Sequence, residues 1–217
     1  MIVIFDWDGT LCDSIEHIVS AMQGACADQG VEPPPAAEVR NIVGLGLPQA
    51  LVQLFPSMDG AGRADLALAY SRHFAAPERG PAQLYAGAIL TLDGLRTRGF
   101  ELAVATGKSR RGLDRVLSSL GLVDYFEATR CADETLSKPH PRMLHEIMTA
   151  RGKSPDEVVM VGDSEYDMDM AQRAGVRSVA VSFGVHGSER LASYGPLAIV
   201  DALPELLELA VFGAGRR

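Results

Sequence analysis

Two acidic turns follow short apolar runs that lie far apart in the chain. Residues 2–5 (IVIF) lead into Asp6 and Asp8, and residues 158–161 (VVMV) lead into Asp163. Apolar runs of this length are typical of buried strands, whose side chains alternate, so Asp6 and Asp8 are expected to start on the same side of the chain. Neighbouring carboxylates repel and need a cation or a shared proton. The alternative is a pair of exposed turn aspartates.

The second acidic turn continues to Asp167, four residues after Asp163, so the two are expected on one helix face. Alone, this pattern is equally typical of an acidic helix start favoured by the helix dipole. With Asp6 and Asp8 it predicts four carboxylates at one sheet edge. Oxygen ligands of this kind suit Mg²⁺, whereas clustered His or Cys for zinc are missing from the sequence.

Phosphate-binding groups are predicted at the same edge. The apolar run 102–105 ends in Thr106 and Gly107, and a helix then opens near Ser109. A hydroxyl, a flexible backbone and free helix N–H groups together favour an anion site, although a plain Ser109 cap explains the pattern equally well. Lys138 precedes a proline and is one of three lysines in the chain. Its ammonium could point inward, or it could be an ordinary surface lysine.

A parallel sheet would bring these residues together. The predicted buried strands are residues 2–5, 102–105, 158–161 and 178–181. The predicted helices between them are 109–120, 141–151 and 164–174, each followed by a glycine that can end a helix. This alternation predicts an α/β fold with a Rossmann-like parallel-sheet core.

A long helical stretch interrupts that alternation. Helical patterns appear at residues 14–29, 36–43, 47–55 and 62–75, with no convincing strand among them. The sequence therefore predicts an inserted all-helical cap over residues 15–84. The α/β core is then formed by residues 1–14 and 85–217.

Composition narrows the function classes. The chain has 217 residues, 47% of them hydrophobic, with 20 basic and 28 acidic residues and a net charge of −8. These values indicate a folded domain and argue against nucleic-acid or anionic-membrane partners. The apolar start is too short for a leader or a membrane span, so we expect a cytoplasmic protein. The three cysteines lack metal or disulfide spacing and are expected to be structural thiols. Oligomeric state is not predicted.

Four pieces in this order resemble the haloacid dehalogenase-like hydrolase superfamily, and in particular its phosphoglycolate phosphatase-like members with a small helical cap. They are DWDGT at 6–10, Thr106, Lys138 before its proline, and GDSEYD at 162–167. The resemblance covers the predicted core and implies a Rossmann-like fold with a closing cap. It also implies hydrolysis of a small phosphorylated metabolite.

The resemblance implies a role for each matching residue. Asp6 would attack phosphorus and form an aspartyl-phosphate, while Asp8 would protonate the leaving alcohol and then deprotonate water. Thr106, the Gly107 backbone and Lys138 would hold the phosphoryl oxygens. Many relatives have asparagine where this chain has Gly107. That difference leaves open whether the neighbouring Lys108 contributes to phosphate binding.

The resemblance also implies a Mg²⁺ site. The ligands would be the Asp6 carboxylate, the Asp8 backbone carbonyl and Asp163, and Asp167 would support both these ligands and Lys138. A carboxylate can approach a phosphate dianion only when nearby cations offset the repulsion.

Other activities fit the sequence less well. Asp8 argues against a haloalkanoate dehalogenase, which has no use for this acid. Residues 15–84 contain no lysine, which argues against a phosphonate hydrolase and counts against a β-phosphoglucomutase-like phosphoryl transferase, the nearest rival. A non-catalytic phosphate-binding or regulatory module would be expected to lose Asp6 or Asp8, and both are present.

Substrate specificity is expected to lie in the cap. Arg40 could clamp a second anionic group, the Gly44 loop could approach the active site closely, and Arg72 is a third candidate. Solvated arginines and a plain helix-ending turn remain the alternatives. His17 is expected to be a surface histidine, and Trp7 is expected to pack in the core.

Overall fold

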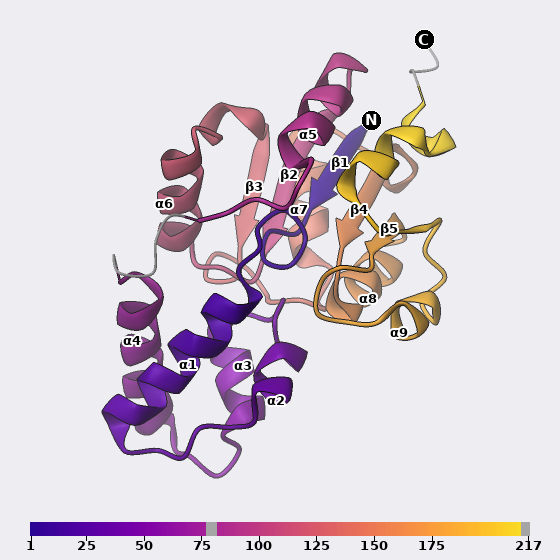
Figure 1. The fold of residues 1–217 in the computed structure, drawn as a ribbon. Helices are drawn as coiled ribbons and strands as arrows, with labels where there is room; N and C mark the ends of the chain where they lie inside the picture. The colour runs from indigo at the N-terminus through magenta and orange to yellow at the C-terminus, as the bar shows by residue number, and fades with distance from the viewer. Residues whose placement is uncertain (77–81, 214–217) are drawn as a thin grey trace.

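Six parallel strands form one sheet in the computed structural model, which describes residues 1–76 and 82–213 (Figure 1). The strands are β1 (Ile2–Phe5), β2 (Glu101–Thr106), β3 (Ala128–Cys131), β4 (Val158–Gly162), β5 (Arg177–Val181) and β6 (Ile199–Val200). Their order is β3-β2-β1-β4-β5-β6. From β1 the chain adds β2 and β3 on one side, and it then adds β4, β5 and β6 on the other side. The strand order therefore changes direction between β1 and β4, and doubly wound sheets bind ligands at such a point. The α/β prediction is confirmed.

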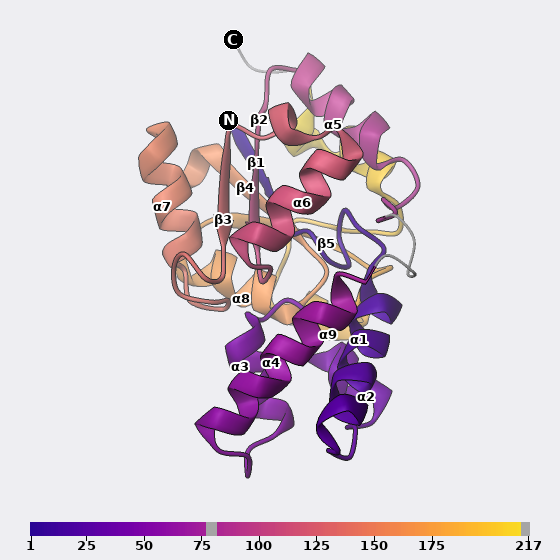
Figure 2. The ribbon, with the colours of Figure 1, turned by 90° about the vertical axis from the view of Figure 1, so that its left-hand side faces the viewer.

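Helices cover both faces of the sheet because side chains on each strand alternate between two apolar layers (Figure 2). Val3 and Phe5 pack in the cluster that α5 and α6 contribute to, and Ile2 and Ile4 pack with α7 and α8. The helices of the core are α5 (Ala88–Thr97), α6 (Arg110–Leu120), α7 (Arg142–Arg151), α8 (Glu165–Arg173) and α9 (Ser188–Ala192). Short 3-10 turns are η2 (Val123–Tyr125), η3 (Pro155–Glu157), η4 (Leu203–Glu208) and η5 (Ala210–Phe212).

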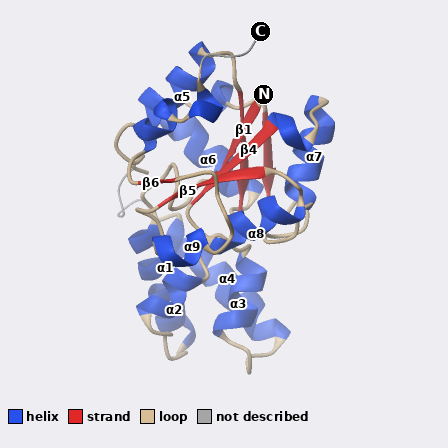
Figure 3. Ribbon diagram, turned by 90° about the vertical axis from the view of Figure 1, so that its right-hand side faces the viewer, coloured by secondary structure: helices blue, strands red, loops and turns tan. Residues whose placement is uncertain are grey.

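Four further helices lie together beyond the carboxyl ends of the strands (Figures 1 and 3). They are α1 (Ile15–Gln29), α2 (Ala36–Asn41), α3 (Leu47–Leu54) and α4 (Gly60–Phe74). Their apolar faces form a cluster of their own, which includes Met22, Leu51 and Leu66. We call these helices and their connecting loops the cap.

The chain leaves and re-enters the core at one place. The Asp13 N–H donates to the Gln83 carbonyl at 2.9 Å, and the Tyr85 N–H donates to the Leu11 carbonyl at 3.0 Å. These bonds join the outgoing and returning segments in an antiparallel pair. The whole cap is therefore an insertion whose two ends are fixed side by side.

Some elements were not predicted from sequence. The strand β3 reads ATRC and shows no apolar run, whereas β6 has two residues at the end of the apolar run 197–200 (LAIV), which was not recognised as a strand. The helices α5 and α9 were also missed. The expected strands and helices match the observed ones to within two residues at each end. Among the described residues, no helix combines the length and apolar character needed to cross a membrane.

Candidate active site

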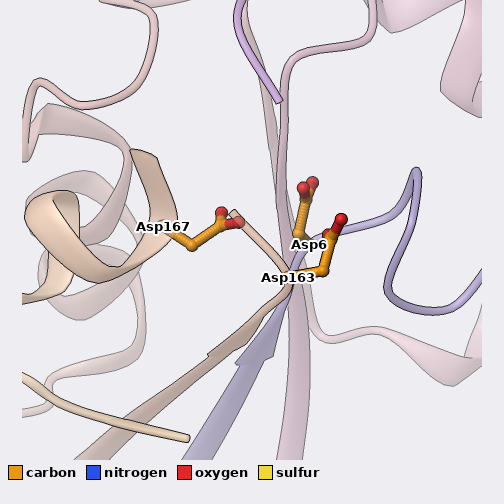
Figure 4. A group of neighbouring side chains, drawn as sticks. All are labelled: Asp6, Asp163 and Asp167. Carbon is orange, nitrogen blue, oxygen red and sulfur yellow. The ribbon is translucent and has the colours of Figure 1, made fainter. Parts of the chain in front are cut away.

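Three carboxylates meet where β1 and β4 end. One oxygen from each of Asp6, Asp163 and Asp167 lies within 4.8 Å of the others, and all three residues are buried (Figure 4). Asp6 follows β1, Asp163 follows β4, and Asp167 points inward from the first turn of α8. The prediction that Asp163 and Asp167 share a helix face is wrong, because α8 starts at Glu165 with Ser164 as its N-cap. Asp163 therefore lies in the loop before the helix.

The Asp163 carboxylate is oriented by two donors. The Thr10 hydroxyl donates to its Oδ1 at 2.7 Å, and the Val185 N–H donates to its Oδ2 at 2.9 Å. Gly9 has a φ of 86°, and a Cβ there would lie 2.2 Å from Asp163 Oδ2. Only glycine suits this turn, since it accepts positive φ and leaves room for the carboxylate.

Lys138 ties the other two carboxylates together. Its Nζ lies 2.7 Å from Asp6 Oδ1 and 2.6 Å from Asp167 Oδ1, and its side chain is 0% exposed. The second oxygen of Asp167 accepts from the Ser164 N–H at 3.1 Å and from the Ser164 hydroxyl at 2.6 Å. This arrangement is a capping box that also fixes the lysine. The ammonium is thus held at the centre of the site.

The buried cluster carries more negative than positive charge. Burial, reinforced by the neighbouring carboxylates, raises the pKa of Asp6 well above its usual value although Lys138 opposes the shift. Burial and the nearby Asp167 raise the pKa of Asp163 to about 7. Burial alone would lower the pKa of Lys138, but Asp167 and Asp6 outweigh it and raise that pKa. One ammonium cannot neutralise three carboxylates, so a further cation would stabilise the site.

The site fits a divalent cation. Asp6 Oδ1 accepts from the Trp7 N–H at 2.6 Å and contacts Lys138, whereas Asp6 Oδ2 is buried and finds no hydrogen-bond partner among the described residues. An unsatisfied buried carboxylate oxygen is costly unless something binds it. Hard oxygen donors in this number are the ligands that Mg²⁺ prefers. Asp6 and Asp163 are the side chains placed to hold it.

The Asp8 side chain lies outside this cluster. Its carboxylate accepts from the Ser14 hydroxyl at 2.6 Å and pairs with the Lys108 Nζ at 2.8 Å. The same ammonium lies 4.5 Å from the centroid of the Phe74 ring in the cap. Lys108, whose role the sequence left open, therefore links Asp8 of the core to α4.

Thr106 and Gly107 lie at the same edge of the sheet as Asp6, because β2 pairs with β1 in parallel and both strands end there. Thr106 is fully buried at the end of β2. An ideal Cβ on Gly107 would lie 2.4 Å from the Leu45 carbonyl oxygen and 2.7 Å from that of Gly44. Glycine at this position lets the cap backbone approach the core, where any larger side chain would overlap these two carbonyl oxygens.

A pocket of about 550 Å³ opens above Asp6 and Asp8. Gly44 and Arg72 line it, and Arg72 lies 3.8 Å from Asp28. Arg40 is not among the lining residues; its guanidinium binds Glu16 at 2.8 Å, so the expectation of a clamp on substrate is wrong. Apolar cap residues form much of the remaining wall: Ile18, Met22, Ile42, Leu47, Ala50 and Leu68.

Three residues of the core form hydrogen bonds with Asn41 of the cap. Its carbonyl accepts from the Tyr166 hydroxyl at 3.0 Å and lies 3.3 Å from His186 Nε2, and its side-chain oxygen accepts from Arg190 at 2.6 Å. His186 Nδ1 accepts from the Glu165 N–H at 2.8 Å, so Nε2 carries the proton and donates.

Several residues that orient the carboxylates were not predicted from the sequence. Thr10 and Ser14 lie in the acidic turn that was singled out, and their hydroxyls could have signalled a role. The Val185 N–H could not be found, since it comes from a loop without any periodic pattern. Trp7 is fully buried as expected. His17 is half-buried and stacks on Phe74 at 4.4 Å, so it is not the surface histidine expected.

Comparison with known proteins settles the family. The model of haloacid dehalogenase-like hydrolases matches residues 3–181. The chain belongs to this family. This haloacid dehalogenase-like hydrolase is 33% identical over 214 residues to the phosphoglycolate phosphatase of Rhodospirillum rubrum, covering 94% of this chain and 88% of the relative. It is 28% identical to pyrophosphatase PpaX of Halalkalibacterium halodurans, covering 95% of both.

A solved structure agrees with that assignment. A predicted phosphatase from Clostridium acetobutylicum superposes with a TM-score of 0.85 at 28% identity, covering 96% of this hydrolase and 98% of that chain. The similarity extends over the cap as well as the sheet. The expectation of a hydrolase of this family is confirmed.

Proposed function

We propose that the protein is a Mg²⁺-dependent phosphatase that hydrolyses a small phosphate monoester through an aspartyl-phosphate on Asp6. The observation that carries the proposal is the orphaned, buried Oδ2 of Asp6 beside two further carboxylates and Lys138, at the floor of a pocket. The names of the phosphatase and pyrophosphatase relatives support the same reaction class.

The first half-reaction uses both aspartates of the first turn. Asp6 attacks phosphorus and the bond from phosphorus to the ester oxygen breaks. Asp8 gives its proton to that departing oxygen, so a neutral alcohol leaves. Ser14 and Lys108 hold the Asp8 carboxyl on the pocket side of the turn. Thr106, the Gly107 N–H and Lys138 hold the phosphoryl oxygens.

The second half-reaction restores the enzyme. Asp8 takes a proton from water, the water oxygen attacks phosphorus, and the bond from phosphorus to Asp6 breaks. Inorganic phosphate leaves, and Asp6 returns to a carboxylate. Asp6, the Asp8 carbonyl and Asp163 would hold Mg²⁺, which would neutralise phosphoryl charge, and Asp167 keeps Lys138 in place.

We also propose that residues 15–84 act as the closing cap. The Asn41 contacts and the approach of the Gly44 loop to Gly107 support this role, because both bring the cap over the β1 and β4 ends. A cap that covers the pocket excludes water while the phosphoryl group is transferred.

The test is phosphate release, with and without Mg²⁺, from a panel of monoesters that includes phosphoglycolate and β-glucose 1-phosphate, and from the anhydride pyrophosphate. We expect Mg²⁺-dependent release and its loss in Asp6→Asn, with a matched fold by circular dichroism. Conversion of β-glucose 1-phosphate to its isomer without phosphate release would instead support the phosphoryl transferase. Binding without either reaction would support the non-catalytic module.

A further inference from the structure

Two arginines of the core line the active-site pocket. Arg111 and Arg115 lie on α6 four residues apart, so they share one helix face, and both line the pocket together with Gly112 of the same helix and Lys108 of the preceding loop. The views of Figures 1 and 2 both place α6 above α4 of the cap. At 1.5 Å rise per residue, Arg115 starts about 6 Å further along the helix than Arg111, on the side away from the loop that carries Lys108. They therefore extend the site away from the carboxylates.

Neither guanidinium group has a partner among the residues that the structure describes. Within residues 1–76 and 82–213, every other arginine holds a carboxylate, a carbonyl oxygen or an aromatic ring. Arg111 and Arg115 have no such contact among these residues, and both are exposed. Arg110, their neighbour on α6, pairs with Glu134 at 2.7 Å.

The pocket's own acids do not compensate this charge. Of the described residues that line it, the carboxylates are Asp6 and Asp8, and each already pairs with a lysine. The outer part of the pocket thus carries excess positive charge in a chain whose net charge is −8. Such a site attracts an anion.

We propose, resting on the phosphatase function above, that Arg111 and Arg115 bind a second anionic group on the alcohol part of the substrate. The substrate class is then a phosphate monoester that also bears a carboxylate or a second phosphate. A guanidinium group recognises either anion with paired N–H bonds. This assigns specificity to α6 of the core as well as to the cap.

The test compares esters that differ in one group. Phosphoglycolate carries a carboxylate where ethylene glycol monophosphate carries a neutral alcohol, and propanediol bisphosphate against propanediol monophosphate tests a second phosphate. We expect Arg111→Gln and Arg115→Gln to lower kcat/KM for the anionic member of at least one pair by between about tenfold and about a hundredfold. The neutral members should change by less than about twofold. Arg110→Gln, on the same helix, should spare all four esters.

A binding measurement separates this proposal from the phosphatase proposal. In the Asp6→Asn protein, calorimetry with phosphoglycolate and with propanediol bisphosphate should show the same selective loss when either arginine is replaced. Equal effects on the charged and neutral esters, or no effect on any, would overturn the subsite. If the native protein hydrolyses none of the esters, the phosphatase proposal fails, and the calorimetric comparison still decides the subsite.

Discussion

The substitution Gly107→Ala would test whether catalysis requires the close contact between the cap and the core. An ideal Cβ there lies 2.4 Å from the Leu45 carbonyl oxygen, and Cβ contacts under 3.0 Å essentially do not occur. To reach 3.0 Å from 2.4 Å, the Leu45 carbonyl must retreat by 0.6 Å. Gly107 is not among the glycines with positive φ, so the alanine backbone itself is unstrained. The backbone N–H of residue 107, which we propose binds the phosphoryl group, remains.

The overlap sets the free energy by which the alanine destabilises the closed position of the cap. Overpacking of this kind costs about 1–3 kcal/mol, which the cap can relieve only by moving away from the core. If that energy is taken from the closed state in which the reaction occurs, kcat/KM for Mg²⁺-dependent phosphate release falls by about fivefold to about 150-fold. The melting temperature should fall little, because an open cap removes the overlap.

The matched control is Gly60→Ala. A Cβ on Gly60 meets nothing within 4 Å, and the residue lies in the cap at the start of α4. This variant should keep the native kcat/KM and melting temperature. A Gly107→Ala protein within about twofold of native kcat/KM would refute the closed contact as the state that reacts.

Three further outcomes are expected. Asp6→Asn should lower phosphate release at least about a thousandfold while the metal-free melting temperature holds or rises, since a buried charge is removed; normal release would exclude Asp6 as nucleophile. Asp163, with its pKa raised to about 7, binds its proton more tightly when folded, so melting in chelator should occur at lower temperature as the pH rises from about 4 to about 7. Added Mg²⁺ should cancel that trend, and identical profiles with and without it would contradict the metal assignment. Tyr166→Phe removes one donor to Asn41 and should lower kcat/KM about fivefold while amide exchange in the cap speeds up; unchanged exchange would mean the bond does not hold the cap.

The meeting of Asp6 and Asp163 was predictable because the carboxyl ends of parallel strands lie at one edge of a sheet. Short apolar runs fixed β1 and β4, and the acids that follow them had to meet at one edge. The Lys138 position was less determined, since it depends on a loop between β3 and α7. Gly107 looked like a lost donor from sequence alone. Its actual constraint comes from cap backbone more than sixty residues away, a contact that no local pattern encodes.

The cap residues were harder to predict for the same reason. Arg40 was one candidate for the substrate site beside the alternative of a solvated arginine, and its partner Glu16, 24 residues earlier, faces it only after α1 and α2 pack together. Arg111 and Arg115 were passed over among many arginines. Their distinction is that they have no partner within residues 1–76 and 82–213, which only the three-dimensional arrangement reveals.

The paired segments at the base of the cap have a consequence for how such enzymes diversify. Because the hydrogen bonds of the Asp13 and Tyr85 N–H groups hold the two ends of the insertion together, the insertion is attached to the core as one closed loop. Doubling the length of a loop costs only about 0.6 kcal/mol of closure entropy. One cap can therefore be exchanged for another of different size without rebuilding the sheet, so new substrates can be acquired while the reaction at β1 and β4 is inherited intact.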